Sequence, residues 1–430
     1  MPVSIENIVS LCKRRGFVYP GSEIYGGLAN SWDYGPLGVE LKNNIKQMWW
    51  NRFVHRRDDM VGIDAALIMN TKVWEASGHL KEFKDPLVEC KKCHKRFRAD
   101  DLKKDNCPDC GEKNAFDEAK DFNLMLKTHL GPLEDSASAV YFRPETAQSM
   151  FVDFKNIVST TRKTLPFGIA QIGKAFRNEI TPGNFIFRTR EFEQMEIEYF
   201  IREEDWQKYF EHWRKEMMGW MEDIGIDLKY IHELEVPAES RAHYSKRTID
   251  FEYDFPFGKK ELYGLAYRTD FDLRSHDKFS GENLKYKDQQ TNEEFWPHVI
   301  EPTWGVDRSV LAVLCSAYSE EGERKFLKLT PQLAPYKAAV FPLMANKDEI
   351  VDTAQKIYKD LRKEFMVAWD DRGNVGKRYY SQDEIGTPYC ITIDYQTLED
   401  KTVTVRDRDT ARQERIAVGD LVDYISKRIS

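Results

Sequence analysis

The spacing of hydrophobic and polar positions changes along this chain, and each spacing predicts a different secondary structure. Apolar side chains recur at helical intervals from residue 42 to 53 and predict a helix with a broad apolar stripe. A second stripe of the same period runs from 204 to 224 and includes Trp206, Phe210 and Trp213. We interpret this second stripe as a packing surface of the core and not as a cofactor-binding box, because large apolar residues at helical spacing most often bury one face of a helix.

Residues 176–200 change to a period of two and predict a β-hairpin. The turn residues Thr-Pro-Gly-Asn at 181–184 supply the reversal. In the first strand the alternation places Arg177 and Glu179 on the same face. In the returning strand it separates a polar set from an apolar set: Phe192, Gln194 and Glu196 against Met195, Ile197 and Tyr199. The polar face suits ATP beside an amino acid, although a solvated strand pair with mixed surface charge explains this segment equally well.

Two prolines bracket a short linker, LTPQLAP, at 329–335 and mark a boundary in the chain. Beyond it, extended and helical stretches alternate as in a βαβ unit, with strands expected at 337–343, 367–370 and 390–394 and helices at 354–365 and 417–428. We therefore expect two domains, residues 1–334 and 335–430, the second a small α/β domain of a size that folds independently.

Residues 85–120 are charged, poor in large aliphatic side chains and rich in cysteine, which indicates a subdomain inserted into the first domain. Two CxxC pairs lie thirteen residues apart within it: Cys90, Cys93, Cys107 and Cys110. Two such knuckles supply the four thiolates of a structural, tetrahedral Zn²⁺ site, and the short linker predicts a small zinc ribbon. Replacement of one cysteine ligand by His94, or four thiols without metal, are the alternatives.

The composition is that of a globular protein. Hydrophobic residues make up 41% and aromatic residues 13%, which excludes a disordered chain. The net charge of -8 argues against indiscriminate binding to nucleic acid but allows a local basic surface. The N-terminal segment lacks the apolar core of a signal peptide, and no apolar run approaches the ~20 residues that span a bilayer. We therefore expect a cytoplasmic protein without a membrane partner, in which paired cysteines indicate metal and not disulfides.

Three charged segments give weaker signals. In EPTWGVDR, Gly305 precedes an apolar helical run, so that Arg308 would lie at the start of a buried helix and could meet phosphate or stack on a base. A glycine C-cap followed by a surface arginine is an alternative that explains the same residues. Glu261 in KELYG and Glu145 in FRPET are explained equally well as charged strand ends.

Eight segments spread over nearly the whole chain carry a stronger signal together. They are WDYGPLGVELKNNIKQMWW, VWEASGH, YFRPETAQ, FRNE, RTREFEQME, EPTWGVDR, GKRYYSQDEIGTPYC and TVRDRDT. The set resembles the glycyl-tRNA synthetases of the single-chain, homodimeric type, which are class II aminoacyl-tRNA synthetases. FRNE with RTREFEQME corresponds to motif 2 of the class, GVDR to motif 3, and residues 62–79 to motif 1, which lies at the dimer interface in that family.

The resemblance implies an α+β fold. An antiparallel-sheet catalytic domain, flanked by helices and carrying the zinc-ribbon-like insertion, would be followed by a C-terminal α/β domain that binds the anticodon. Two positions depart from the family pattern: Thr71 stands where motif 1 usually has a proline, and Thr303 where the glycine pocket usually has a serine. Neither departure removes an ionic catalytic group, so we expect an active enzyme.

The resemblance also implies a role for each motif residue. Arg177 would hold the α-phosphate of ATP and Glu179 the adenine amino group, while Arg308 would stack on the adenine face opposite Phe192. Arg177, Glu179 and Arg308 are thus the expected catalytic residues, and Glu261 is the expected Mg²⁺ ligand. The expected ATP-binding residues are Arg177, Asn178, Glu179, Phe187, Arg188, Thr189, Arg190, Glu191, Phe192, Glu261, Leu262, Gly305, Val306, Asp307 and Arg308.

Glycine is expected beside the ATP. The resemblance implies that Glu145, Glu196 and Glu301 surround its ammonium group, with Thr303 assisting. The full set of expected glycine-binding residues is Arg98, Glu145, Phe192, Glu193, Gln194, Met195, Glu196, Glu301, Pro302, Thr303, Trp304 and Gly305. A tight pocket suits the smallest amino acid. Steric exclusion of a larger side chain discriminates more strongly than the contact energy that is lost when a side chain is absent.

The implied reaction joins glycine to ATP, releases pyrophosphate and then transfers glycine to tRNA(Gly). The basic segment 401–415 and the charged, aromatic segment 377–380 are candidates for contact with the anticodon loop, and a solvated surface is the alternative. Another class IIa synthetase is the nearest rival. A synthetase-like, non-catalytic nucleic-acid-binding subunit is a second rival, but it should have lost some of four residues that are all present: Arg177, Glu179, Glu196 and Arg308.

Overall fold

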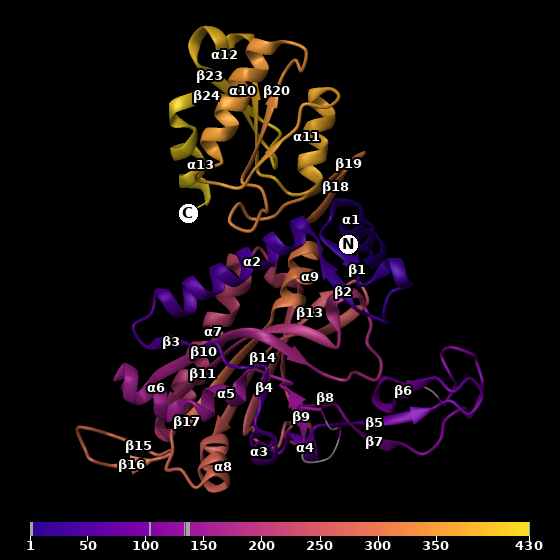
Figure 1. The fold of residues 1–430 in the computed structure, drawn as a ribbon, viewed down its shortest axis with the longest axis vertical. Helices are drawn as coiled ribbons and strands as arrows, with labels where there is room; N and C mark the ends of the chain where they lie inside the picture. The colour runs from indigo at the N-terminus through magenta and orange to yellow at the C-terminus, as the bar shows by residue number, and fades with distance from the viewer. Residues whose placement is uncertain (1–2, 103–104, 133, 135–137, 430) are drawn as a thin grey trace.

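Two bodies, each with its own large hydrophobic core, make up the molecule in Figure 1. The computed structural model describes residues 3–102, 105–132, 134 and 138–429. The lower body contains a seven-stranded sheet covered by helices, and the upper body, which holds the C-terminus, contains a five-stranded sheet. Within the described part of the chain, no helix combines the length and apolar character needed to cross a membrane.

The large sheet has the strand order β12-β13-β14-β17-β11-β10-β3. All neighbouring strands are antiparallel except β3, which runs parallel to β10. The antiparallel sheet that the resemblance implied is therefore present. The strands are β3 (Met60–Gly62), β10 (Phe167–Phe176), β11 (Glu191–Ile201), β12 (Ile231–Glu235), β13 (Arg247–Phe255), β14 (Gly258–Thr269) and β17 (His298–Gly305).

Helices cover both faces of this sheet. On one face, Met195 and Trp304 point into a core shared with α2, α7 and α9. On the other face, Phe200 and Val299 pack with α5, α6 and α8. Because side chains alternate along a strand, the strands that fill the first core also present polar residues on the second face. The helices are α2 (Pro36–Trp50), α5 (Ala147–Val152), α6 (Phe154–Thr161), α7 (Trp206–Asp223), α8 (Phe271–Ser280) and α9 (Val306–Ala317).

Helix α2 contains the apolar stripe predicted at 42–53 but begins earlier, at Pro36, with Gly35 as its N-cap. Proline is favoured in the first turn of a helix because its missing N–H would be unpaired there. A π-helical turn over Asn51–His55 then continues the stripe. The stripe predicted at 204–224 is confirmed as core by four side chains of α7 that are fully buried: Phe210, Trp213, Met217 and Trp220.

Strands β10 and β11 form the predicted hairpin, paired from Phe167 with Phe200 to Phe176 with Glu191. The prediction that Arg177 and Glu179 lie on the first strand is wrong, because β10 ends at Phe176. The N–H of Arg177 still donates to the carbonyl oxygen of Arg190 across 2.9 Å, but that of Asn178 donates to the carbonyl oxygen of Leu124 across 2.8 Å. The reversal is therefore much wider than the four-residue turn predicted at 181–184, and it includes a short 3-10 helix, η4 (Phe185–Phe187).

Residues 85–120 form an extension at the edge of the lower body, to the right in Figure 1. Its three-stranded sheet has the order β6-β5-β7, with β5 (Lys84–Glu89) in the centre, β6 (Arg96–Arg98) on one side and β7 (Lys120–Asn123) on the other. A second small sheet, in the order β4-β9-β8, connects the extension to the body. Its strands are β4 (Ile68–Met69), β8 (Lys127–His129) and β9 (Ala139–Phe142).

The remaining elements of the lower body are short. The N-terminal helix α1 begins with Ser4, whose hydroxyl caps the N–H of Asn7, and ends at Gly16 in the left-handed conformation. The short elements of this body include α1 (Ile5–Arg15), β1 (Val18–Pro20), β2 (Trp32–Tyr34), α3 (Thr71–Ala76), α4 (His79–Glu82), η7 (Ala238–Ser240), β15 (Tyr286–Lys287), β16 (Glu294–Phe295), β18 (Tyr318–Glu321) and β19 (Arg324–Leu327).

The upper body is an α/β unit with the strand order β21-β20-β22-β23-β24, in which β20 is parallel to both neighbours. Helix α10 begins six residues before the helix predicted at 354–365. The helix predicted at 417–428 is present as α13, which begins later, at Leu421, while α11 and α12 were not predicted. The elements are β20 (Ala338–Pro342), α10 (Asp348–Leu361), β21 (Val367–Trp369), α11 (Val375–Glu384), β22 (Tyr389–Ile393), α12 (Tyr395–Asp400), β23 (Thr402–Asp407), β24 (Gln413–Ala417) and α13 (Leu421–Ile429).

Most arginines of the two segments expected to contact RNA are structural. Arg378 is buried and donates to four backbone carbonyl groups, including that of Pro342 at 2.6 Å. Arg406 is buried against Asp383, and Arg408 donates to the carbonyl oxygen of Leu329 across 2.8 Å. The sequence pattern did not distinguish these buried cations from surface ones. The side chains of these segments that remain exposed and could meet RNA include Lys377, Tyr380, Lys401 and Arg412.

Candidate active site

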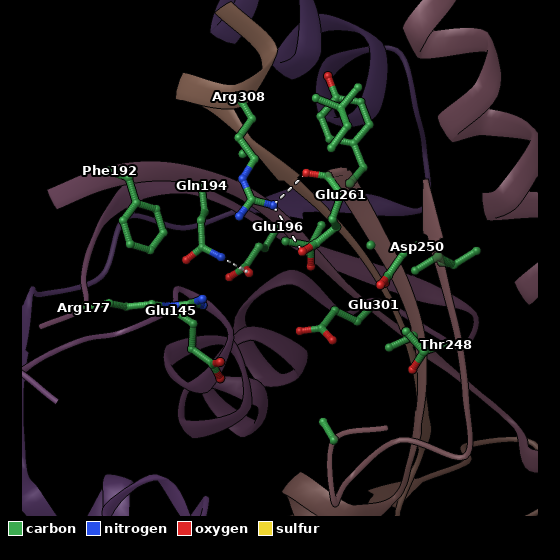
Figure 2. Close-up of a pocket in the computed structure, with 18 of the residues that line it drawn as sticks. Glu145, Arg177, Phe192, Gln194, Glu196, Thr248, Asp250, Glu261, Glu301 and Arg308 are labelled. Atoms are coloured by element: carbon green, nitrogen blue, oxygen red, sulfur yellow. Dashed lines mark hydrogen bonds and ion pairs between the residues drawn. The ribbon is translucent and has the colours of Figure 1, made fainter. Parts of the chain in front are cut away.

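A cavity of about 320 Å³ opens on the polar face of the large sheet, between β11, β13, β14 and β17 (Figure 2). The structure brings together most of the residues predicted for the ATP and glycine sites, from segments far apart in the chain. The predicted residues that line the cavity are Glu145, Arg177, Glu179, Phe187, Arg188, Thr189, Phe192, Glu193, Gln194, Glu196, Glu261, Leu262, Glu301, Thr303, Gly305, Asp307 and Arg308.

Several predicted residues lie outside this lining. Met195, Trp304 and Val306 are fully buried in the core under α7 and α9, because strand alternation and the start of α9 turn them away from the cavity. Strand alternation likewise turns Pro302 away from the cavity, whereas its neighbours Glu301 and Thr303 line the cavity. The remaining predicted residues that are not among the lining are Arg98, Asn178, Arg190 and Glu191.

Each of these last four residues has another partner. Arg98 is 3.3 Å from a carboxylate oxygen of Asp85 in the extension. The guanidinium of Arg190 donates to the carbonyl oxygen of Glu179 across 3.1 Å, and the carboxylate of Glu191 pairs with Lys174. Asn178, as described above, bonds through its backbone. The geometry therefore gives no support to direct ligand contact by these four side chains.

Two arginines from distant parts of the chain, Arg177 and Arg308, line the cavity (Figure 2). The guanidinium of Arg177 lies 5.2 Å from the ring centre of Phe192, and its Nε donates to the carbonyl oxygen of Pro144. Arg308, in the first turn of α9, lies 4.5 Å from the ring of Phe187. Aromatic rings and fixed cations that line one cavity are suited to a planar base and its phosphates.

Arg308 is held by Glu261 of β14: its Nη1 is 3.2 Å from Oε2 of that carboxylate and 3.0 Å from the carbonyl oxygen of the same residue. Although burial opposes ionisation, the charges of Arg308 and Arg177 lower the pKa of Glu261. Asp250, on the neighbouring strand, has its pKa raised to about 7 by burial and by the charges of Glu261 and Glu252. Two carboxyl groups, Glu261 and Asp250, thus lie close to Arg308.

Three further carboxylates line the same cavity. Glu196 accepts from the backbone N–H of Thr146 and from Nε2 of Gln194, each across 2.8 Å, and also from the Thr146 hydroxyl. Glu145 lies 3.2 Å from Nε2 of His79. Glu301 accepts a 2.7 Å hydrogen bond from Arg268. Each carboxylate is therefore oriented by a different element of the fold.

These carboxylates differ in their tendency to ionise. Burial opposes the ionisation of Glu145, but the His79 and Arg268 charges outweigh it and hold the pKa of Glu145 well below its usual range. Burial and the Glu145 charge raise the pKa of Glu196. Burial, together with the Glu196 and Glu145 charges, raises the pKa of Glu301 to about 8 despite Arg268. A cation that enters beside them would favour the ionised form of Glu196 and Glu301.

Several lining residues were not predicted from the sequence. Asp250 and Thr248 belong to the alternating stretch RTIDFEYDF, so a search for period-two polar positions would have found them. Tyr244 carried no such signal, since it lies in an irregular segment that follows η7. Arg268 was also missed. It is fully buried beneath the cavity, 3.7 Å from the Tyr244 ring, and holds Glu301.

The four predicted zinc ligands converge in the extension. Their sulfur atoms all lie within 4.8 Å of one another, with 3.7 Å between Cys90 and Cys110 and between Cys93 and Cys107. Gly111, with a positive φ of 72°, follows the second knuckle and donates its N–H to the carbonyl oxygen of Cys107. The alternative ligand His94 lies outside the cluster, 3.2 Å from Glu89.

Comparison with known proteins agrees with this geometry. A family model described as "tRNA synthetase class II core domain (G, H, P, S and T)" matches residues 132–317, and one described as "Anticodon binding domain" matches residues 337–428. The first therefore covers most of the large sheet, and the second covers the upper body.

Curated relatives match along the whole chain. A glycine–tRNA ligase of Geobacillus thermodenitrificans is 50% identical over 463 residues, which covers 100% of this chain and 98% of the relative. Ligases of the same name from Alkaliphilus oremlandii and Thermobifida fusca are also 50% identical, over 99% of this chain and 98% of each relative. This chain therefore belongs to the glycyl-tRNA synthetase family of class II aminoacyl-tRNA synthetases.

Proposed function

We propose that this chain activates glycine with ATP and transfers the activated glycine to tRNA(Gly). The observation that carries the proposal is that Glu145, Glu196 and Glu301 line the same cavity as Arg177 and Arg308. Such a cavity can bind the cation of an amino acid next to the polyanion of ATP. Family membership supports the same reaction.

In the first step, a carboxylate oxygen of glycine attacks the α-phosphorus of ATP and the bond to the pyrophosphate oxygen breaks. In the second, a ribose hydroxyl of the tRNA attacks the carbonyl carbon of glycyl-adenylate, AMP leaves and the hydroxyl proton is released. Phosphoryl transfer depends mainly on alignment and on neutralisation of charge at the phosphate. Arg177 is the residue we assign to the α-phosphate.

The nucleotide would lie over β11. Its adenine ring would stack between Phe192 and the guanidinium of Arg308, both of which line the cavity. Glu179 would accept from the adenine amino group, and Arg188 would pair with the terminal phosphates. Arg188 is steadied by the extension, since its Nη1 lies 3.1 Å from Oδ2 of Asp101.

Glycine would place its ammonium group among the three carboxylates and its α-carbon against Thr303. Selection by exclusion suits this arrangement, because the pocket needs only to reject an added methyl group. Thr303 keeps the hydroxyl of the usual serine, and its extra methyl group reduces the space further. The second departure from the family pattern, Thr71, lies at the first position of α3, where a proline fits as well, and its hydroxyl donates to the carbonyl oxygen of Ala139.

Magnesium fits the carboxyl groups beside Arg308. Hard oxygen donors are the ligands that Mg²⁺ prefers, and Glu261 is the residue we assign to it, with Asp250 near enough for Glu261 to raise its pKa. When bound, the ion would supply charge neutralisation at the phosphates of ATP. Arg308 would orient the proposed ligand, because its guanidinium holds the Glu261 carboxylate in place.

The extension at 85–120 is proposed to be a zinc-ribbon-like insertion with a structural role. Four cysteine sulfurs within 4.8 Å of one another match a closed tetrahedral Zn²⁺ site, which leaves no open position for chemistry. The catalytic domain would then comprise residues 1–334, and the anticodon-binding domain residues 335–430. We further propose that the enzyme is a cytoplasmic homodimer, with motif 1 at the interface, as the family resemblance implies.

The decisive experiment is ATP–pyrophosphate exchange measured with each of the twenty amino acids. The proposal expects exchange with glycine alone. A second amino acid used as efficiently as glycine would favour the rival class IIa assignment. Tight tRNA binding without any exchange would favour the non-catalytic rival.

A further inference from the structure

Glu198 is a fully buried carboxyl group that the proposed reaction does not use. It lies on β11, two residues beyond Glu196 and therefore on the same face of the strand. Its exposed fraction is 0%, and among the described residues neither side-chain oxygen has a hydrogen-bond partner. A buried carboxylate without a donor is very costly, so such a group takes up a proton.

The strand register sets Glu198 against Glu301. In the pairing of β11 with β17, Glu196 is opposite Thr303 and Tyr199 is opposite Ile300, so the residue opposite Glu198 is Glu301. Directly opposed side chains on antiparallel strands have their Cβ atoms about 4.5–5.5 Å apart. Two carboxylates at that separation in a buried site repel each other strongly, and one of them is therefore protonated.

The cation beneath the pocket does not neutralise Glu198. Arg268 gives its Nε and Nη2 to the two oxygens of Asp272, each across 2.8 Å, and its Nη1 to Glu301 across 2.7 Å. Three of its five N–H groups are thus given to other carboxylates, and among the described residues none bonds to Glu198. Glu301 has a cation and Glu198 has none, so the proton belongs on Glu198.

We propose that Glu198 is a positioning residue that works as a neutral carboxylic acid, donating its O–H to Glu301 and thereby holding that carboxylate toward the ammonium group of glycine. The proposal rests on the assignment of Glu301 to the ammonium site. Glu198 keeps its proton when Glu301 ionises, so that it adds no further negative charge beside the ammonium site. Glu198 itself does not touch the substrate.

The groups around Glu198 favour this protonation state. Acidic neighbours approach from three elements: Glu301 from β17, Asp272 from α8 and Glu196 from β11 itself, while Arg268 of β14 is a basic neighbour. Burial and the Glu301 charge raise the pKa of Glu198 well above its ordinary value. On β10, the residue paired with Glu198 is the apolar Ile169.

Two substitutions separate the neutral donor from the charge. Glu198→Gln keeps a donor of the same shape but can never ionise, whereas Glu198→Leu keeps the volume and removes the donor. We expect Glu198→Gln to retain the KM for glycine in ATP–pyrophosphate exchange within about threefold. We expect Glu198→Leu to raise that KM about tenfold or more while the KM for ATP stays unchanged.

Infrared difference spectroscopy of the whole enzyme with saturating glycine gives an independent reading that does not depend on the leucine variant folding. The wild type should show the carbonyl band of a buried, protonated carboxylic acid, and Glu198→Gln should lack it. The proposal would be overturned by a missing band in the wild type, by a glutamine variant as impaired as the leucine variant, or by a folded leucine variant with the parental KM for glycine.

Glu301→Gln distinguishes failure of this inference from failure of the ammonium-site assignment. A raised KM for glycine in Glu301→Gln, together with an unchanged KM in Glu198→Leu, would contradict the role of Glu198 alone. An unchanged KM in Glu301→Gln would contradict the assignment of Glu301 itself, and with it the basis of the inference.

Discussion

Gln194 donates from its Nε2 to Oε1 of Glu196 across 2.8 Å, two residues along the same strand. The other oxygen of Glu196 is taken by the backbone N–H and the hydroxyl of Thr146. Both oxygens of this buried carboxylate are therefore held, and its orientation toward the cavity is set before any ligand arrives. Preorganisation of this kind reduces the cost of ordering the site upon binding.

The first prediction concerns this pair. Gln194→Ala removes one hydrogen bond to a buried charge, which is worth about 1.5–3 kcal/mol. We expect the KM for glycine in ATP–pyrophosphate exchange to rise by about ten- to a hundredfold. Gln47→Ala is the control, because the Gln47 amide bonds to Asn51 on the outer side of α2. Equal KM values for glycine in both variants would argue against a role for Gln194.

The second prediction concerns Arg308. Arg308→Met removes a fixed cation from the nucleotide end of the cavity, and loss of one preorganised charge-stabilising group costs about 10²–10³ in rate. We expect kcat for exchange to fall by this amount and the KM for ATP to rise, with little change in the melting temperature. The control is Arg202→Met, since Arg202 pairs with Asp288 and Glu293 away from the cavity. A variant with parental kcat would contradict the assignment.

The third prediction is a pH dependence that arises from Glu301, whose pKa in the empty enzyme is raised to about 8. Below that pH the group is largely protonated, and it must lose its proton to pair with the glycine ammonium. The KM for glycine should therefore fall as the pH rises from about 6.5 toward 8 and then level off. Initial rates of exchange at several glycine concentrations across this range measure the effect.

Glu301→Gln serves as the control for that profile, because an amide does not titrate. Its KM for glycine should be higher and should vary less with pH between 6.5 and 8. A wild-type KM that rises with pH over this interval would have the opposite sign and would refute the interpretation.

The fourth prediction concerns zinc. Purified enzyme should contain about one zinc ion per chain, and Cys107→Ser should lose it, because a four-thiolate site tolerates poorly the loss of a ligand. Residues 85–120 should then become sensitive to protease, and the KM for ATP should rise several-fold, since Asp101 of this segment pairs with Arg188. Metal analysis, limited proteolysis and exchange kinetics check the three effects.

Cys315→Ser is the matched control for that variant, because Cys315 lies on α9 outside the cysteine cluster. Zinc content unaffected by Cys107→Ser, or loss of zinc in Cys315→Ser, would contradict the proposed ligand set.

Local patterns predicted the parts of the site that lie on regular strands. Period-two alternation placed Phe192, Gln194 and Glu196 on one face of β11, and all three line the cavity. The same reasoning failed for Arg177 and Glu179, because β10 ends at Phe176 and the backbone at Asn178 bonds to Leu124, a contact that no local signal marks.

Contacts between distant segments also explain the other errors. Arg378, Arg406 and Arg408 look like surface cations in the sequence, but their partners are backbone carbonyls and a carboxylate that only the folded chain brings to them. Arg268 and Tyr244 were missed for the same reason, since each acquires its role by packing against the other beneath the cavity. Sequence motifs located the site, whereas the residues that support it depend on tertiary structure.

The most direct test of the account is glycine-dependent ATP–pyrophosphate exchange by Glu196→Ala. Loss of a buried carboxylate that faces the ammonium group should abolish exchange at ordinary glycine concentrations, while circular dichroism and ATP binding remain close to those of the wild type. Exchange near the parental rate in a folded Glu196→Ala enzyme would contradict the claim that these carboxylates bind glycine.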